Sequence, residues 1–157
     1  MIGERVFVDT NVLVYSYDSD AGIKHNTAQA VLRELWESRT GAVSTQVLQE
    51  FYVTVTRKLA KPLARKLARE VIGTYAAWPV HRPQVADLIA ASELGERYRL
   101  SFWDALVIAS AQRSQAHTLV SEDLQDGQRF GDLIIVNPFS ASQTANHPGA
   151  QAGRRPR

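Results

Sequence analysis

The segment Val6-Phe7-Val8-Asp9-Thr10-Asn11 places three consecutive apolar residues directly before an acid. An apolar run without polar alternation is typical of a strand that is buried on both faces, as in a parallel sheet. In open α/β sheets, ligands bind outside the carboxyl ends of the strands. Asp9 therefore stands where a functional side chain is expected.

Outward from this segment, short apolar runs alternate with helical patterns. Further strands are expected at residues 42–43, at Val80, and at residues 118–120 and 133–136. Gly41 is expected to close the first long helix, and a helix after Pro83 carries Val85, Leu88 and Ile89. The alternation predicts an α/β fold of three layers, with a short, mainly parallel central sheet of four or five strands flanked by helices.

The 157-residue chain contains no cysteine, which excludes disulfides, thiolate metal ligands and cysteine nucleophiles. It has 18 basic and 16 acidic residues, but three of the basic ones, Arg154, Arg155 and Arg157, lie near the C-terminus. Without those three the charges nearly balance, so overall charge does not argue for a nucleic-acid partner. Composition predicts one domain over residues 1–140 and a flexible polar, Arg-containing tail over residues 141–157.

No apolar run is long enough to cross a bilayer. The first residues, MIGERVFVDTN, lack the apolar segment and the cleavage site of a signal peptide. We therefore expect a protein of the cytoplasm that has no membrane partner.

Four acids follow predicted strands or lie early in the helices after them. Asp9 ends the first strand, and Asp123 comes three residues after the strand expected at residues 118–120. Glu50 lies in the first turns of the helix after residues 42–43, and Asp104 lies in the first turn of a helix begun by Ser101. All four can reach one end of the sheet in such a fold.

Packed carboxylates repel one another and raise each other's pKa, which a bound cation offsets. Carboxylate oxygens together with water suit Mg²⁺ or Mn²⁺. A metal held in this way activates water and stabilises charge on a phosphoryl group. The four histidines are scattered, and neither a paired-histidine motif nor a Gly-rich phosphate loop is present.

Each acid also has a structural interpretation. Asp9 could cap the following helix, and Glu50 could belong to a solvated helix face. Ser101-Phe102-Trp103-Asp104 fits a capping box, and residues 121–124 fit a turn. Glu122 and Asp126 also lie beside Asp123, and either could share or replace its role. No single residue decides between these interpretations.

A cluster of basic residues surrounds Pro62. Its members are Arg57, Lys58, Lys61, Arg65, Lys66 and Arg69. They could contact an RNA backbone, which would make binding strongly salt-dependent, or they could form solvated helix faces. Phe102 and Trp103 are expected in the core, and stacking on bases is the alternative.

Taken together, four segments resemble the motifs of the PIN-domain family, over a range from about Val6 to Phe139. The first is a strand followed by Asp9-Thr10-Asn11, and the second is residues 44–51 with Glu50. The third is residues 100–105 with Asp104, and the fourth is residues 119–124 with Asp123. The order and spacing of all four make the resemblance specific.

The resemblance implies a metal-dependent endoribonuclease, most similar to VapC-type toxins of type II toxin–antitoxin pairs. It also implies an RNA substrate, a small cognate antitoxin and a homodimer. Asp9, Glu50 and Asp104 would hold one Mg²⁺ or Mn²⁺, and Asp123 would complete the cluster or help to hold a second metal. The side chains expected to orient carboxylates or water are Thr10, Asn11, Ser101 and Ser121.

Two other classes of function remain open. A phosphotransfer enzyme that forms an aspartyl-phosphate would use Asp9 as nucleophile, but it usually has a second Asp two residues later, where this chain has Asn11. A catalytically inactive PIN-like module that binds RNA or protein is expected to lack at least one acid. All four matching positions are acidic here.

Overall fold

The computed structural model of the chain describes residues 3–140. The expected tail, residues 141–157, lies outside the described residues. At the centre of the fold is strand β1 (Val6–Val8), in which Phe7 and Val8 are fully buried. It pairs in parallel with β2 (Gly41–Ser44) on one side and with β4 (Thr118–Val120) on the other. The continuous apolar run is therefore a buried strand of a parallel sheet, as predicted, and it pairs on both sides.

The sheet has six strands in the order β3-β2-β1-β4-β6-β5. β3 (Val80–His81) and β6 (Leu133–Val136) extend it in parallel, whereas β5 (Arg129–Phe130) pairs antiparallel with β6. The expected number was four or five strands. The additional one is β5, which has only two residues and therefore no apolar run that could mark it in the sequence.

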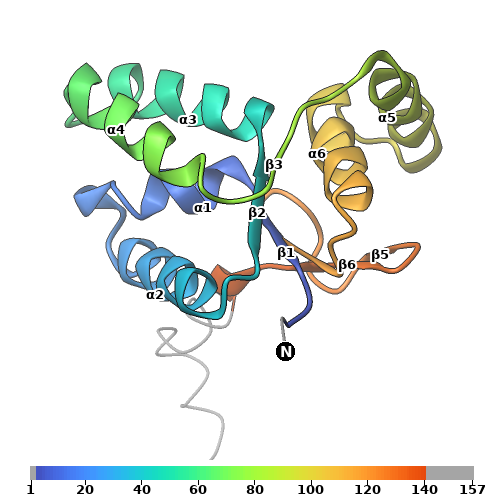
Figure 1. Cartoon of the computed structure of the whole chain (residues 1–157), viewed down its shortest axis with the longest axis horizontal. Coiled ribbons are helices and arrows are strands. Elements are labelled where there is room, and N and C mark those ends of the chain that lie inside the picture. The colour runs from blue at the N-terminus through green and yellow to red at the C-terminus, as the bar shows by residue number, and fades with distance from the viewer. Residues whose placement is uncertain (1–2, 141–157) are drawn as a thin grey trace, which may run out of the picture.

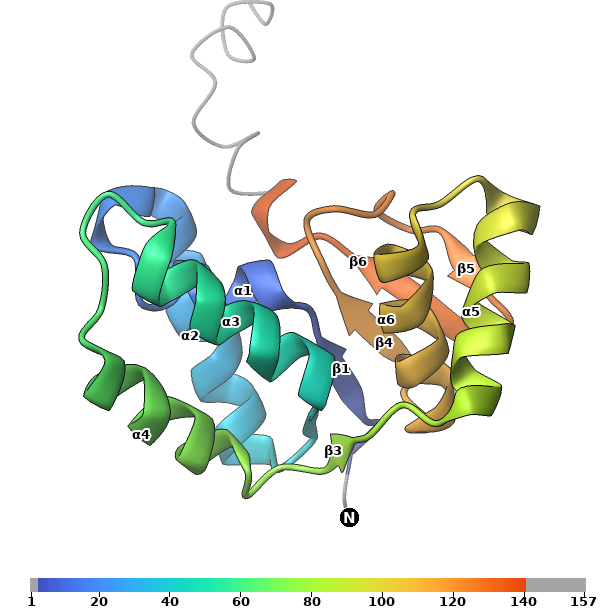
Figure 2. The same ribbon diagram turned by 90° about the horizontal axis from the view of Figure 1, so that it is seen from above.

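Helices cover both faces of the sheet, which confirms the three-layer α/β architecture (Figures 1 and 2). In both views four helices gather on one side of β1 and β2: α1 (Thr10–Tyr15), α2 (Ile23–Ser38), α3 (Thr45–Arg57) and α4 (Arg65–Tyr75). A short 3₁₀ turn, Ser19–Ala21, connects α1 to α2. On the other side lie α5 (Val85–Tyr98) and α6 (Phe102–Arg113). Within residues 3–140, no helix combines the length and apolarity needed to span a bilayer.

Helix α5 turns its large apolar side chains outward, since Val85, Leu88 and Ile89 are 72%, 40% and 57% exposed. Its buried residues are Asp87, Ala91 and Gly95. A Cβ at Gly95 would stand only 3.6 Å from the Cβ of Ala105 in α6, so the two helices approach closely along this face. The small residues therefore decide which face of α5 is buried.

The prediction that Gly41 closes helix α2 is wrong, because Gly41 is the first residue of β2. The helix ends at Ser38, and Arg39 takes the left-handed conformation that follows it, with φ of 59°. Gly41 is required for packing, because a Cβ at this position would lie 2.5 Å from the ring of Trp78. Trp78 in turn packs against Trp36 and Tyr75, with ring centroids 5.0 and 4.9 Å away.

Replacing Gly41 with Ala is therefore expected to destabilise the fold by about 1–3 kcal/mol, because the aromatic cluster must move to admit the methyl group. Gly73→Ala in α4 is the matched control, since nothing lies within 4 Å of its added Cβ. We expect that variant to be stabilised by about 0.5–1 kcal/mol through helix propensity. Urea unfolding of both variants measures the difference, and equal stability would contradict the packing role of Gly41.

Candidate functional site

Parallel pairing of β2, β1 and β4 brings the carboxyl ends of three strands to one edge of the sheet. Asp9 follows β1 directly, and its side chain is only 4% exposed. Its Oδ1 accepts a hydrogen bond of 2.7 Å from the Thr10 backbone N–H, so Asp9 does cap α1. Its Oδ2 accepts a 2.7 Å hydrogen bond from the Ser121 hydroxyl. Asp9 therefore caps helix α1 and also lies at the carboxyl end of β1, where a functional side chain is expected.

Glu50 lies on α3, and two neutral donors hold its carboxylate. The Thr10 hydroxyl donates to Oε2 at 2.9 Å, and the Gln46 side-chain amide donates to Oε1 at 2.9 Å. The same Gln46 amide also donates to the backbone carbonyl of Trp103 at 3.2 Å, which connects α3 to α6. Gln46 was not identified from the sequence, although its position four residues before Glu50 on one helix is a usable signal.

Asp123 is the acid of its segment that turns toward the other three. Asn11 Nδ2 donates to its Oδ2 at 2.9 Å, and its backbone N–H donates to the Ser121 hydroxyl oxygen at 3.1 Å. Asp126 instead accepts a 2.8 Å hydrogen bond from the Asn137 backbone N–H. Glu122 accepts one of 2.6 Å from the Tyr15 hydroxyl. The two neighbouring acids are thus engaged elsewhere.

Asp104 lies in the first turn of α6, where Ser101 is the N-cap. The Ser101 hydroxyl oxygen accepts a 3.1 Å hydrogen bond from the Asp104 backbone N–H, as the capping pattern predicts. Burial raises the pKa of the Asp104 carboxyl, a hydrogen bond with Ser101 lowers it, and the charges of Asp123 and Glu50 raise it further. Asp104 is therefore close enough to both acids to respond to their charge.

Asp9 is the most strongly perturbed of the four. Burial raises its pKa from 3.8 to about 7, against hydrogen bonds from Ser121 and the Thr10 backbone that lower it. The charges of Asp123 and Glu50 raise the pKa as well. Among residues 3–140, the ion pairs formed by Lys or Arg involve none of the four acids. The cluster accumulates negative charge that the protein does not neutralise.

A cavity of about 780 Å³ opens beside the cluster. Its polar lining includes Thr10, Asn11, Gln46, Glu50, Lys58 and Asp123. Trp103 also lines it and is 61% exposed, while Phe102 is 37% exposed. The expectation that these two aromatic residues lie in the core is wrong, because both precede the first buried turn of α6. Of the six basic residues around Pro62, all are exposed and Lys58 lines the cavity.

The donor chemistry fits Mg²⁺ or Mn²⁺, because all four charged groups are carboxylates. The charges of Glu50 and Asp123 also raise the pKa values of Asp9 and Asp104, as expected where no cation neutralises them. As placed, no three Asp, Glu or His side chains in the described part of the chain converge tightly enough to hold a metal directly. Mg²⁺ usually keeps several waters and binds through only one or two carboxylates. An arrangement with some ligands bridged by water therefore fits the geometry.

Asp9→Asn is expected to stabilise the metal-free protein above pH 7, by roughly 2–4 kcal/mol. The pKa of Asp9 is about 7 in the folded protein and 3.8 in an unfolded chain. Between pH 3.8 and pH 7, folding is therefore accompanied by uptake of a proton. The contribution of Asp9 to wild-type stability is therefore greatest at low pH and falls as pH rises toward 7. Asn cannot ionise, so its advantage should shrink as pH is lowered toward 4. Thermal unfolding from pH 4 to 8 measures this, and a constant difference would contradict it.

Comparisons with known proteins agree with this architecture. The model of the PIN domain family matches residues 6–126. A search of curated protein sequences finds no match.

Solved structures share the fold at low sequence identity. A toxin–antitoxin complex from Klebsiella pneumoniae is 17% identical, with a TM-score of 0.62, and the match covers 85% of this chain and 97% of that one. VapC20 from Mycobacterium tuberculosis, described as a toxin that cleaves the sarcin–ricin loop, is 23% identical with a TM-score of 0.57, covering 87% and 94%. VapBC2 from Rickettsia felis, bound to a promoter DNA fragment, is 22% identical with a TM-score of 0.58, covering 84% and 97%. By the family match over most of its length, the chain belongs to the PIN-domain family.

Proposed function

We propose that this protein is a metal-dependent endoribonuclease that hydrolyses RNA phosphodiester bonds. The observation that carries the proposal is the buried Asp9 carboxyl, whose pKa is raised to about 7 at a sheet edge shared with Glu50 and Asp123. A buried carboxylate without a Lys or Arg partner is energetically unfavourable, and a cation bound at the cluster would offset that cost. The cavity beside it gives a substrate access.

In this proposal, Asp9, Glu50 and Asp104 hold one Mg²⁺ or Mn²⁺, directly or through water, and Asp123 completes the cluster. A divalent metal bound there supplies an activated water and offsets charge on the scissile phosphate. The neutral donors fix the carboxylates in advance: Thr10 and Gln46 orient Glu50, Ser121 orients Asp9, and Asn11 orients Asp123. Ser101 fixes the start of α6 that presents Asp104.

The cavity suits an unpaired RNA strand. Trp103 offers an exposed ring beside the acids, and stacking on aromatic rings is a common way of holding single-stranded bases. Lys58 can meet a phosphate at the same cavity. Arg57, Lys61, Arg65, Lys66 and Arg69 are exposed and could continue the phosphate contacts.

We further propose that the protein is the toxin of a type II toxin–antitoxin pair, active in the cytoplasm, with a small antitoxin as partner. Support comes from the solved structures of the same fold, several of which are described as toxin–antitoxin complexes or as VapBC. A homodimer belongs to the same proposal. The exposed apolar residues Val85 and Ile89 of α5 are available for such an assembly.

The proposal is tested by incubating a mixed RNA pool with wild type, Asp9→Asn and Asp104→Asn in Mg²⁺, in Mn²⁺ and in EDTA. We expect the wild type to cleave only with metal. Each variant should lose at least about 100-fold in rate, because even outer partners of metal ligands contribute about 10–100-fold. Wild-type rates in Asp9→Asn at saturating Mn²⁺ would overturn the site assignment.

Two further measurements, of metal binding and of phosphate transfer from a small phosphoryl donor to the protein, separate the alternatives. Metal binding without RNA cleavage, by folded protein free of inhibitor, would favour a binding module of PIN-like fold. Formation of an acid-stable aspartyl-phosphate at Asp9 would favour phosphotransfer.

Lys58→Gln should weaken RNA binding and make it less dependent on salt. Each phosphate contact in a single strand contributes about 0.7 to the slope of log affinity against log salt concentration. We expect the slope to fall by about that amount when binding is measured in the Asp9→Asn background, where RNA is not cut. Arg33→Gln, on an exposed position of α2, is the charge-matched control. Equal slopes for the two variants would remove Lys58 from the RNA path.

A further inference from the structure

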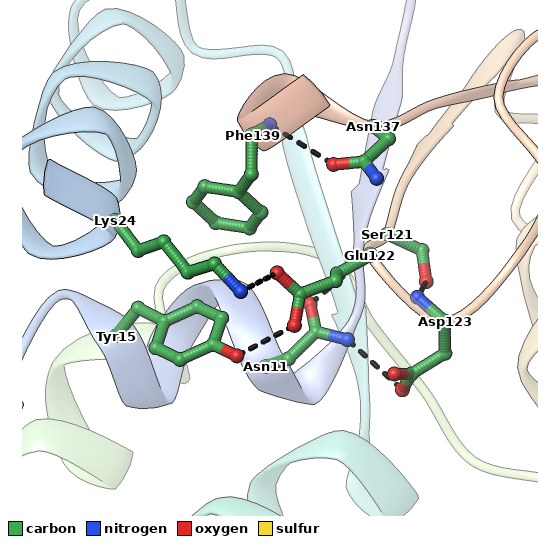
Figure 3. Close-up of polar contacts among 8 residues, drawn as sticks. All are labelled: Asn11, Tyr15, Lys24, Ser121, Glu122, Asp123, Asn137 and Phe139. Atoms are coloured by element: carbon green, nitrogen blue, oxygen red, sulfur yellow. Dashed lines mark hydrogen bonds and ion pairs between the residues drawn. The ribbon is translucent and has the colours of Figure 1, made fainter. Parts of the chain in front are cut away.

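Beside the acidic cluster, the carboxylate of Glu122 is held away from it by two side chains (Figure 3). The Tyr15 hydroxyl donates to Glu122 Oε1 at 2.6 Å, and Lys24 Nζ lies 2.5 Å from Oε2. Tyr15 belongs to α1 and Lys24 to α2, so two helices converge on one acid of the loop after β4. The Lys24 and Glu122 side chains are only 30% and 21% exposed, which makes this pair less solvated than an ordinary surface ion pair.

Aromatic rings surround the ammonium group of Lys24. Its Nζ lies 5.1 Å from the ring centroid of Tyr15 and 5.9 Å from that of Phe139, within the range of cation–π attraction. The two rings meet edge to face at 5.1 Å, and Phe139 is fully buried. The Phe139 backbone N–H donates to Asn137 Oδ1 at 2.9 Å, which fixes the segment after β6 (Figure 3). The Lys24 ammonium group therefore has two aromatic neighbours in addition to Glu122.

Glu122 is connected to Asp123 through Asn11 as well as through the chain. Asn11 Oδ1 accepts from the Glu122 backbone N–H at 3.4 Å, while Asn11 Nδ2 donates to Asp123 Oδ2 at 2.9 Å (Figure 3). Ser121 accepts from the Asp123 N–H and donates to Asp9. The side chains of residues 121, 122 and 123 thus point to three different sets of partners.

The electrostatics favour a charged pair with a neutral phenol. The hydrogen bond with Glu122 raises the pKa of Lys24, and burial together with Glu122 raises the pKa of Tyr15. Lys24 is accordingly a cation and Tyr15 a hydrogen-bond donor over the neutral pH range. Without them, the Glu122 carboxylate would lose its hydrogen bond and its ion pair.

We propose that Lys24 and Tyr15 are positioning residues, which hold Glu122 so that the loop after β4 presents Asp123, and only Asp123, to the metal cluster. This inference rests on the proposed function, since it assigns the pair a role in metal binding. It also makes a prediction about the metal-free protein, where Lys24 and Tyr15 should hold the loop in place.

The test begins with Lys24→Met, which keeps the apolar stem and removes the charge. We expect the affinity for Mn²⁺, measured by calorimetry, to fall about 10-fold, the lower end of what outer partners of metal ligands contribute. In the metal-free protein, we expect faster hydrogen exchange at the Asp123 amide, which donates to Ser121. Tyr15→Phe should show both effects to a smaller degree. Arg33→Met, at an exposed position of the same helix, should show neither.

The double variant Lys24→Met/Glu122→Gln distinguishes positioning from a general structural role. If Lys24 acts by restraining the Glu122 charge, neutralising that charge should restore most of the lost Mn²⁺ affinity, so the effects will not be additive. If Lys24 only stabilises the fold, the double variant will bind Mn²⁺ no better than Lys24→Met. That result, or an unchanged Asp123 exchange rate in Lys24→Met, would overturn the inference.

Failure of the proposed function has a different signature. In that case the wild type would bind Mn²⁺ without cutting RNA, or would not bind it, whereas the exchange measurement on metal-free protein would still report on Lys24 and Glu122. RNA cleavage by the wild type, together with unchanged Mn²⁺ affinity in Lys24→Met, would reject the positioning role alone.

Discussion

Burial of the Asp9 carboxyl at the end of β1 is the constraint around which this edge of the sheet is organised. Phe7 and Val8 of the strand before it are fully buried, and the strand pairs on both sides, which holds Asp9 at a buried position. Its charge is opposed by burial and by nearby carboxylates, which brings its pKa to about 7. The surrounding residues reduce this unfavourable free energy with hydrogen bonds from Ser121 and Thr10, but they do not remove it. A local arrangement that lowers stability in this way is expected at a functional site.

The protein uses neutral donors inside the cluster and a cation outside it. Hydroxyl and amide groups of Thr10, Asn11 and Ser121 hold the three acids that come from different elements. A neutral donor fixes a carboxylate without cancelling its charge, so the charge remains available to a metal. Lys24 is instead paired with Glu122, the residue next to Asp123 in the loop after β4. The three acids therefore have neutral hydrogen-bond partners, whereas Glu122 has a cation beside it.

Much of the fold could be predicted because the pattern is strong at the central strands. Val6, Phe7 and Val8 read as a strand buried on both faces, and the parallel sheet with helices on both sides follows from the alternation. β5 escaped prediction, because two residues carry no periodicity. The exposure of Trp103 and the outward face of α5 also escaped. Helical spacing shows which residues share a face, but small residues such as Gly95 decide which face can pack closely.

For the candidate site, the sequence by itself determined which acids follow the strands and which hydroxyl or amide residues accompany them. Asp9, Thr10 and Asn11 are adjacent in the chain, as are Ser121, Glu122 and Asp123, so their grouping is local. Only the tertiary structure decided that Asn11 meets Asp123, that Gln46 joins Glu50 to α6, and that Glu122 turns to Lys24. These contacts join residues far apart in the chain, and neighbouring residues of one loop can point in different directions. Their partners depend on how β1, β4 and the helices pack, which no local pattern encodes.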